Sequence, residues 1–380
     1  MSLTFTFKQQ DFLEHYWQKK PGVFRQALAN FDDLITPDEL AGFTMEEEID
    51  SRYVSNYQNT WEVEHGPFDE EKLTSLRESH WQLIMQAANH WHPDVATLAQ
   101  PFEFLPQWLF DDIMVCYSSP KGGVGPHIDQ YDVFIIQGHG KRSWKVGAKD
   151  NGQYTETTQH SQLRQIEGFE PIIDEILEPG DMIYIPAGFP HEGDTLEHSM
   201  SYSVGFRSPK EQELLSNIAD YVIAHDKGDH HLEAPNRPAQ PTFNMITQSD
   251  RALLKEMLLK QLDDSTFDEF LGCMLSQSRH LLDVVEPEEP YHPSDVQSNL
   301  YAGDRLIKVL GLKVLFNEGE VNTAYINGEK ITVSAELSPL LHALIQHNTL
   351  SIHDLDNHQS VECFELITEL INKGYWYLSE

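Results

Sequence analysis

The sequence has 380 residues, of which 61 are Asp or Glu and 26 are Lys or Arg, so its formal net charge is −35. A chain of this length favours two or three domains over one compact core. So acidic a surface repels the phosphates of nucleic acids and membranes and attracts basic proteins. Plain solubility or a salt-rich host would explain the same charge, and both explanations stay open.

Three cysteines, Cys116, Cys273 and Cys363, are far apart and odd in number. They show neither a disulfide framework nor zinc-binding spacing, which predicts a reducing compartment. The first residues lack the basic flank and apolar core of a signal peptide, and no apolar run approaches the about 18 residues that span a membrane. We therefore expect a cytoplasmic protein that makes no membrane contact.

Short β-prone runs dominate the sequence from Thr4 to Arg207. Their turn spacing predicts a barrel-like core of antiparallel strands. Helical pieces are expected within this region at Phe12–Trp17, Gly22–Ala29 and Leu73–Ala88.

Three amphipathic stretches follow the β-rich region. The first opens at Ser208 and Pro209, and its apolar residues at 214, 215, 218, 221 and 222 share one helical face. After a polar break, the second and third stretches run over residues 253–262 and 267–281. Apolar stripes of this kind usually form internal core, but they can also pack across a two-fold axis.

An acidic, proline-rich joint, EPEEPYHP from Glu286 to Pro293, precedes the C-terminal part. Beyond the joint, strand-like pieces at 313–316, 324–326 and 331–333 mix with helices expected at Ser338–His347 and Val361–Lys373, an order typical of a winged helix. Many winged helices bind DNA, but the sequence from Asp304 onward has five Lys or Arg against eleven Asp or Glu. We therefore predict protein contacts and no DNA binding.

The segment GPHIDQYDVFIIQG contains His127 and Asp129 two positions apart. Side chains on a strand alternate between its faces, so these two point the same way and can reach one metal ion. A third ligand can come from His191, which follows the β-prone run at 182–185 and the sharp turn PAGFP. Two histidines and one carboxylate form the facial triad suited to Fe(II), with positions left open for substrate and oxygen.

Two other pairs have the same spacing. His92 and Asp94 stand at the end of a helix-like stretch, and His231 and Glu233 stand in a polar, proline-rich segment. Neither pair has strand context or a later histidine after a strand and a turn, so both are weaker candidates than His127, Asp129 and His191.

Arg142 lies fifteen residues after His127, at the start of a strand, where its side chain can point into the same barrel. A buried guanidinium needs an anionic partner, and a dicarboxylate cosubstrate would supply one in a bidentate pair. Lys141 would face the opposite way. An exposed pair of basic residues is the alternative interpretation.

These segments resemble the JmjC-type 2-oxoglutarate oxygenases, and more closely the bacterial ribosomal oxygenases, which hydroxylate arginine in a protein. The resemblance covers nearly the whole chain. It is carried by DFLEHYWQKKPGVFR (Asp11–Arg25), DDIMVCYSSPKGGVGPHIDQYDVFIIQG (Asp111–Gly138), LEPGDMIYIPAGFPHEG (Leu177–Gly193), YSVGF (Tyr202–Phe206), NGEK (Asn327–Lys330) and KGYWYL (Lys373–Leu378).

The resemblance implies an α+β protein with a JmjC double-stranded β-helix of the cupin or jelly-roll type. It implies a catalytic domain at 1–208, a helical dimerisation domain at 209–290 and a winged-helix-like domain at 291–380, assembled as a homodimer. His127, Asp129 and His191 would be the iron ligands and the catalytic centre. Arg142, where many JmjC enzymes have lysine, would bind the far carboxylate of 2-oxoglutarate with help from Ser118.

Several polar residues lie near these positions. Tyr131 shares a strand face with Asp129, and both Tyr131 and Asp132 are candidates for substrate binding, through ring stacking or pairing with a guanidinium. Glu192 and Asp194 flank His191 and could fix a histidine tautomer, although acids in such positions are more often just loop residues. His139, in a turn, is better explained as a solvated loop residue.

We predict an Fe(II)- and 2-oxoglutarate-dependent protein hydroxylase that uses O2 and yields succinate and CO2. By resemblance, its substrate is an arginine of a basic large-subunit ribosomal protein. One alternative is a cupin metal enzyme, an isomerase or hydrolase, which would have no use for Arg142. The other is a sensor whose barrel binds a small acid and whose C-terminal part binds DNA. Within the oxygenases, histidine or lysine hydroxylation and demethylation stay open.

Overall fold

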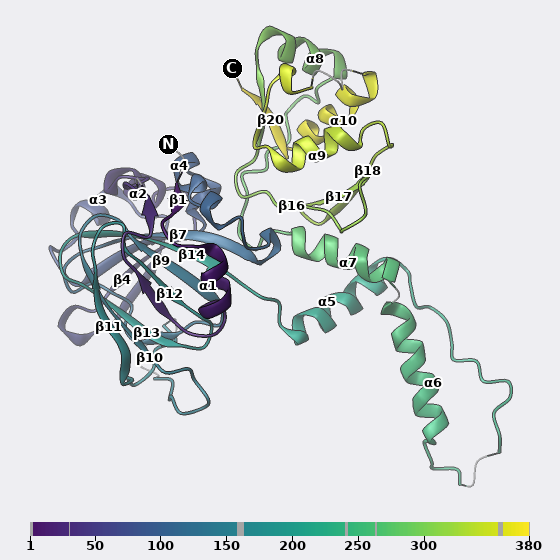
Figure 1. Cartoon of the computed structure of the whole chain (residues 1–380), viewed down its shortest axis with the longest axis horizontal. Helices are drawn as coiled ribbons and strands as arrows, with labels where there is room; N and C mark the ends of the chain where they lie inside the picture. The colour runs from purple at the N-terminus through teal and green to yellow at the C-terminus, as the bar shows by residue number, and fades with distance from the viewer. Residues whose placement is uncertain are drawn as a thin grey trace.

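The structure is a computed structural model that describes residues 3–29, 31–157, 163–239, 242–262, 264–355 and 360–379. A β-barrel, three central helices and a C-terminal unit follow one another along the chain (Figure 1). No helix in the described ranges is both long and apolar enough to cross a membrane.

Two antiparallel sheets form the barrel and confirm the predicted double-stranded β-helix. The larger sheet has the order β2 (Gly22–Phe24), β12 (Met182–Ile185), β9 (Asp132–Gln137), β14 (Ser199–Phe206), β7 (Phe110–Ser118), β6 (Trp81–Met85), β4 (Ser51–Ser55), β5 (Glu62–His65). The smaller sheet has the order β11 (Pro171–Leu177), β10 (Arg142–Gly147), β13 (Pro190–Thr195), β8 (His127–Ile128).

Short elements accompany the larger sheet, and most of them pack against its outer face. They are β1 (Thr4–Phe5), α1 (Gln9–His15), β3 (Leu28–Ala29), α2 (Pro37–Phe43), η1 (Tyr57–Asn59), α3 (Glu70–Thr74), η2 (Ala88–His90), α4 (Pro93–Thr97), η3 (Gln100–Phe102) and η4 (Gln107–Leu109). Strand β9 is buried on both faces, because Phe134 and Ile136 pack under these elements whereas Val133 and Ile135 face the barrel interior. The barrel interior is therefore closed on this side by apolar side chains.

Two of the helices predicted in this region are wrong. Gly22–Ala29 forms strands β2 and β3 on either side of a turn, in which Gln26 has a φ of +47°. Within Leu73–Ala88, only the end of α3 is α-helical, and Trp81–Met85 is strand β6. All five residues of β6 are buried between β4 and β7, so its sequence lacks the alternation that identifies a half-exposed strand.

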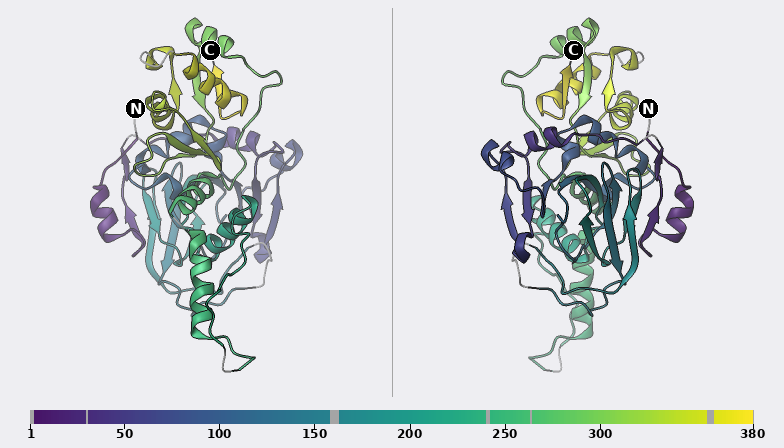
Figure 2. Two further views of the ribbon diagram at one scale, coloured as in Figure 1. Left: turned by 90° about the vertical axis from the view of Figure 1, so that its right-hand side faces the viewer. Right: turned by 90° about the vertical axis from the view of Figure 1, so that its left-hand side faces the viewer.

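The central region contains α5 (Glu211–Ala224), α6 (Gln248–Leu259), η5 (Lys260–Leu262) and α7 (Asp264–Ser276). Figure 2 shows α6 extending away from the barrel and the C-terminal unit. Leucines 254, 258 and 259 of α6 and leucine 262 of the following η5 are exposed by 46%, 72%, 53% and 39%. This helix therefore presents an apolar surface that the rest of the described chain does not cover.

The C-terminal unit has its own core and the predicted winged-helix arrangement. It consists of α8 (Pro293–Ala302), β15 (Arg305–Lys308), β16 (Val314–Leu315), β17 (Thr323–Ile326), β18 (Glu329–Thr332), α9 (Ser338–Gln346), β19 (Thr349–Leu350), η6 (Ile352–Leu355), α10 (Val361–Asn372) and β20 (Trp376–Ser379). The prediction missed α8 and the strands β15, β19 and β20. The domain limits at residues 208 and 290 stay predictions.

His90 joins the barrel to the C-terminal unit. Its Nδ1 lies 2.8 Å from the carbonyl oxygen of Leu281, and Gly311 packs so tightly on the ring that an added Cβ would lie 2.1 Å from His90 Cδ2. Gly311 has a φ of +76°, so glycine is required here for its conformation as well. Burial lowers the pKa of His90 to about 4, and the imidazole is therefore neutral at pH 7.

This burial predicts a dependence of stability on pH. Between pH 6.5 and 4 the unfolded chain protonates His90 and the folded chain does not, so stability falls as the pH decreases through this window. We expect His90→Asn to remove about 2 kcal/mol of the stability difference between pH 7 and pH 5. Urea unfolding at both pH values measures the difference. The control His231→Asn, at an exposed histidine, should keep it, and an unchanged difference in His90→Asn would contradict the prediction.

Candidate active site

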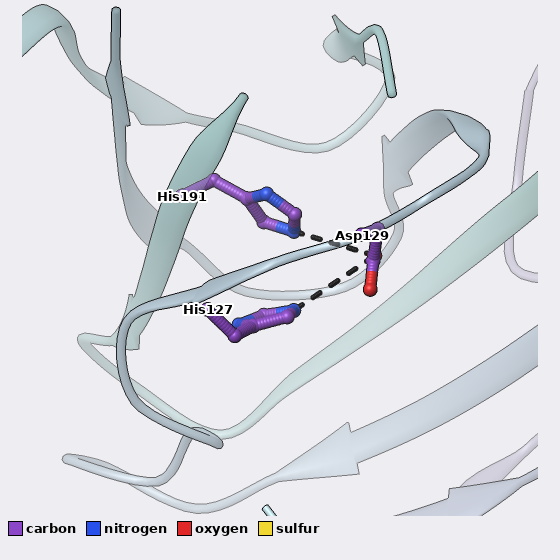
Figure 3. A group of neighbouring side chains, drawn as sticks. All are labelled: His127, Asp129 and His191. Atoms are coloured by element: carbon purple, nitrogen blue, oxygen red, sulfur yellow. Dashed lines mark ion pairs between the residues drawn. The ribbon is translucent and has the colours of Figure 1, made fainter. Parts of the chain in front are cut away.

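His127, Asp129 and His191 converge at one end of the smaller sheet (Figure 3). Strands β8 and β13 pair so that His127 and His191 are directly opposite, with their ring centroids 4.2 Å apart. Asp129 follows β8, and its Oδ2 lies 3.9 Å from His127 Nε2 and 3.6 Å from His191 Nε2. One potential ligand atom from each residue thus lies within 4.8 Å of the others.

Backbone carbonyls fix the orientation of both imidazoles. His127 Nδ1 lies 2.9 Å from the oxygen of Gly125, and His191 Nδ1 lies 3.1 Å from the oxygen of Phe189. A carbonyl oxygen can only accept, so each Nδ1 carries the proton and each Nε2 presents a lone pair toward Asp129. Burial, with a smaller effect of His127, lowers the pKa of His191 to about 4. The three residues therefore offer two imidazole nitrogens and a carboxylate, a donor set that fits a divalent iron ion.

The weaker predicted pairs are not assembled in this way. His92 caps the start of α4, where its Nδ1 accepts from the Val95 amide at 3.4 Å, and Asp94 is exposed. His231 and Glu233 are exposed, in a segment without helix or strand. Neither pair belongs to a group of metal-binding residues among those that the structure describes.

One other group within the described ranges has metal-binding residue types, namely Asp111, Asp112 and His280. Its carboxylates already have partners: Asp111 pairs with Arg279 at 2.5 Å, and Asp112 accepts from the Ala87 amide at 2.9 Å and from a side-chain amide at 2.7 Å. This group is accounted for by packing between the barrel and the elements that follow it.

The triad opens into a cavity of about 430 Å³ inside the barrel. Its apolar wall comes from the inward faces of β9 and β10, including Val133, Ile135 and Trp144. Arg142 lines the same cavity. The structure thus places the predicted metal ligands and the predicted anion-binding residue around one cavity.

Arg142 is only 3% exposed and has no carboxylate within ion-pair distance in the described part of the chain. Its Nη atoms donate to Ser201 Oγ at 3.2 Å, Gln82 Oε1 at 3.3 Å and the Gly193 oxygen at 3.0 Å, while its Nε has no partner there. Burial lowers its pKa. Because an unpaired buried cation is costly, an anion in the cavity is the partner that this site lacks.

Lys141 has the opposite orientation. Its exposed side chain pairs with Glu178 at 2.6 Å. The alternative of an exposed basic pair therefore describes Lys141 but not Arg142.

Ser118, the other residue predicted to contact the cosubstrate, lies outside the cavity lining. It is fully buried, its Oγ has no partner among the described residues, and it does not line the cavity. The hydroxyl that accepts a hydrogen bond from Arg142 belongs to Ser201, which pairs with Cys116 of β7. The sequence prediction missed Ser201 and Gln82, because identifying them requires the register between strands.

The two predicted substrate contacts have different positions. Tyr131 lines the cavity, and burial raises the pKa of its hydroxyl well above the usual range. Asp132 does not line it: its carboxylate accepts from Tyr184 Oη at 2.5 Å and from Gln18 Nε2 at 3.2 Å. The predicted substrate contact of Asp132 finds no support in this arrangement, since its oxygens hold the barrel wall together.

The remaining candidates lie outside the metal site. Glu192 and Asp194 alternate with His191 along β13 and so face away from the histidine rings, whose Nδ1 atoms contact carbonyls instead. His139 is exposed, and its amide donates to Asp33 at 2.9 Å, as expected of a solvated turn.

Comparisons with known proteins agree with this geometry. A family model described as the JmjC domain matches residues 97–214, and one described as a ROXA-like winged helix matches residues 256–377. The ribosomal protein uL16 3-hydroxylase of Escherichia coli (strain K12) is 45% identical over 381 residues, covering 99% of both chains. The chain belongs to the JmjC ribosomal oxygenases.

Other relatives support the family. A probable ribosomal oxygenase of Haemophilus influenzae is 32% identical over 335 residues, 84% of this chain and 80% of that protein. The structure of E. coli YcfD matches with a TM-score of 0.93, and YcfD in complex with cobalt and 2-oxoglutarate matches with 0.90; each is 43% identical and covers 100% of both chains. As predicted, the cofactors of this JmjC family are Fe(II), 2-oxoglutarate and O2.

The uncompensated charge of Arg142 predicts how 2-oxoglutarate binds. With Mn(II) bound in place of Fe(II), Arg142→Met should weaken 2-oxoglutarate binding about 10- to 100-fold, because a charge-assisted pair is lost. Calorimetric titration measures the dissociation constant, and metal affinity should not change. Lys141→Met is the matched control and should bind like the wild type. Equal affinity in both variants would show that the far carboxylate is held elsewhere.

Proposed function

We propose that this chain is an Fe(II)- and 2-oxoglutarate-dependent hydroxylase that acts on an arginine side chain of a large-subunit ribosomal protein, the counterpart of uL16. The observation that carries the proposal is the shared cavity of the His127, Asp129, His191 group and the unpaired Arg142. The name of the E. coli relative supports the protein substrate. The arginine rests on the resemblance to arginine hydroxylases.

Each side chain has a defined part in this proposal. His127, Asp129 and His191 hold the iron, which supplies the oxidising chemistry once 2-oxoglutarate and O2 are bound. Arg142 holds and orients the far carboxylate of 2-oxoglutarate. Succinate and CO2 leave as co-products. The apolar wall of the cavity excludes bulk water from the reacting atoms.

Tyr131 is the strongest candidate for contacting the target side chain. It stands two residues from Asp129 and lines the cavity, and its neutral ring can stack on a guanidinium. The high net negative charge favours a basic ribosomal protein as the partner at long range. We propose that this encounter takes place in the cytoplasm.

The rival functions have less support. A cupin isomerase or hydrolase has no use for a buried cation beside its metal, and a DNA-binding sensor is disfavoured by the acidic C-terminal unit. Histidine or lysine as the oxidised residue remains an outcome that experiment decides.

Mass spectrometry after turnover tests the proposal. We expect the purified protein with Fe(II) and 2-oxoglutarate to form succinate faster when recombinant uL16 from the same organism is added, and uL16 to gain one oxygen atom on an arginine. His191→Ala should abolish both, because one of three metal ligands is lost. Fragmentation spectra locate the oxygen. Oxygen on histidine or lysine would refute the arginine assignment alone, whereas no oxygen on uL16 or another ribosomal protein would refute the proposed substrate class.

We further propose that α6 contributes to a homodimer. Leu254, Leu258 and Leu262 recur every four residues, so they form one exposed stripe on the helix and its 3-10 extension. A second copy of the same helix would cover this stripe.

Sedimentation velocity tests the dimer. At micromolar concentration the wild type should sediment as a dimer, and Leu258→Glu as a monomer, since a carboxylate at an apolar contact is destabilising. Leu196→Glu, at a leucine 49% exposed on the barrel, is the control and should remain dimeric. A monomeric wild type would contradict the prediction.

A further inference from the structure

A second cavity lies between the barrel and the C-terminal unit. Its volume is about 430 Å³, and no residue that lines it lines the active-site cavity. The barrel contributes apolar walls that include Phe102 and Phe206, and the C-terminal unit contributes the segment Lys308–Val314 with Ile345. The cavity is therefore independent of the metal site.

Lys308 is buried in this cavity without a carboxylate partner. It ends β15 and is 7% exposed. Among the described residues its Nζ has a single hydrogen-bond contact, a long one of 3.5 Å to the carbonyl oxygen of Ile345, and no ion pair. Burial lowers its pKa to about 8, and the carboxylate of Glu103 only partly offsets that effect.

Lys313 is the second buried ammonium, at 8% exposure. Its nearest opposite charges, Asp111 and Asp112, do not come within ion-pair distance of it, and the described part of the chain offers its Nζ no hydrogen bond. Asp111 pairs with Arg279 instead. Burial lowers the pKa of Lys313 as well.

The two lysines have different charged surroundings. Lys313 also lines a neighbouring pocket with Asp111 and Arg279, whereas the only carboxylate among the residues lining the cavity with Lys308 is that of the exposed Glu103. The Lys308 ammonium is thus buried without a buried carboxylate to balance it. Removing an ammonium from water without a partner is costly, so this arrangement is stabilised when an anion occupies the cavity. A volume of this size lies within the range of about 300–1,000 Å³ typical of small-molecule sites.

The segment carrying both lysines is held rigidly. The Leu312 amide donates to the Val309 oxygen at 3.2 Å, which closes a turn, and Gly311 within that turn packs on His90 of the barrel. The backbone that carries Lys308 is therefore positioned before any ligand binds, and this lowers the entropic cost of binding.

We propose that this interdomain cavity binds a small organic anion, with its carboxylate or phosphate group at the Lys308 ammonium and its apolar part against Phe102 and Phe206. The ligand would contact both the barrel and the C-terminal unit. It therefore stabilises their junction, whatever the substrate of the active site is.

Thermal unfolding of the full chain tests this site. Phenyl phosphate, benzoate and inorganic phosphate are compared at constant ionic strength. We expect phenyl phosphate or benzoate to raise Tm by about 2–5 °C at saturation and inorganic phosphate to raise it less, because it lacks the apolar part. A larger shift with phenyl phosphate assigns a phosphate ligand, and a larger shift with benzoate assigns a carboxylate. No shift with either aromatic anion overturns the proposal.

Lys308→Met separates a binding role from a structural one. The variant should lose the anion-dependent shift, and its anion-free Tm should equal or exceed that of the wild type, because an unpaired buried charge is removed. Lys255→Met, at an exposed lysine on α6, should keep the full shift. A shift that survives in Lys308→Met, or a lower anion-free Tm, overturns the proposal. Repeating the series with Arg142→Met excludes binding in the active site, since only a shift that persists there supports the interdomain cavity.

Chemical labelling of the unmodified wild type gives a second measurement. Acetylation followed by peptide mass spectrometry should show Lys308 protected several-fold by phenyl phosphate, with Lys255 labelled equally in its presence and absence. Equal labelling of Lys308 with and without the anion overturns the proposal.

Discussion

Strand β13 determines the geometry of the active site, because one of its edges positions the two histidines and the other positions Arg142. On one edge it pairs with β8, which sets His191 opposite His127. On the other it pairs with β10, which places Arg142 opposite Thr195 and lets the guanidinium reach the Gly193 carbonyl. A shift of one residue in either register would turn His191 or Arg142 out of the cavity. The proposed metal ligands and the proposed cosubstrate anchor therefore depend on the same set of backbone hydrogen bonds.

Buried cations without carboxylate partners occur in both cavities. The chain carries 35 more acidic than basic charges, yet Arg142, Lys308 and Lys313 are each at most 8% exposed and have no ion pair among the described residues. The ion pairs that are present, such as Lys141 with Glu178, lie mostly at the surface, where each contributes little. Where carboxylates are so abundant, a buried cation left without one is best explained by a ligand that supplies the negative charge.

The sequence was most informative where side chains alternate between the two faces of a strand. The two-residue spacing of His127 and Asp129, and the strand and turn before His191, predicted a convergence that the structure contains. Strand β6 was not predicted, because both of its faces are buried and its sequence therefore does not alternate between apolar and polar residues. Ser201 rather than Ser118 contacts Arg142 because the register of β14 on β7 decides which hydroxyl is near, and no local pattern encodes that register. The interdomain cavity could not be predicted for a related reason, since Lys308 and Lys313 become buried only when the barrel and the C-terminal unit pack together.

The charge around the active-site mouth adds a constraint on the substrate. Arg52, Arg164 and Arg207 line the cavity of a strongly acidic protein. Arg164 and Arg207 are paired with glutamates, whereas Arg52 makes no ion pair in the described part of the chain. Salt screens the net negative field over a Debye length of about 8 Å at physiological salt, so a partner experiences it only at close approach, and at contact it meets these local charges. The proposed basic substrate would thus be attracted to the surface by the net charge, and the segment that enters the cavity can offer carbonyl or carboxylate oxygens to the guanidinium of Arg52. Under the proposed function, selection at the mouth depends on the residues that flank the target side chain as well as on the target itself.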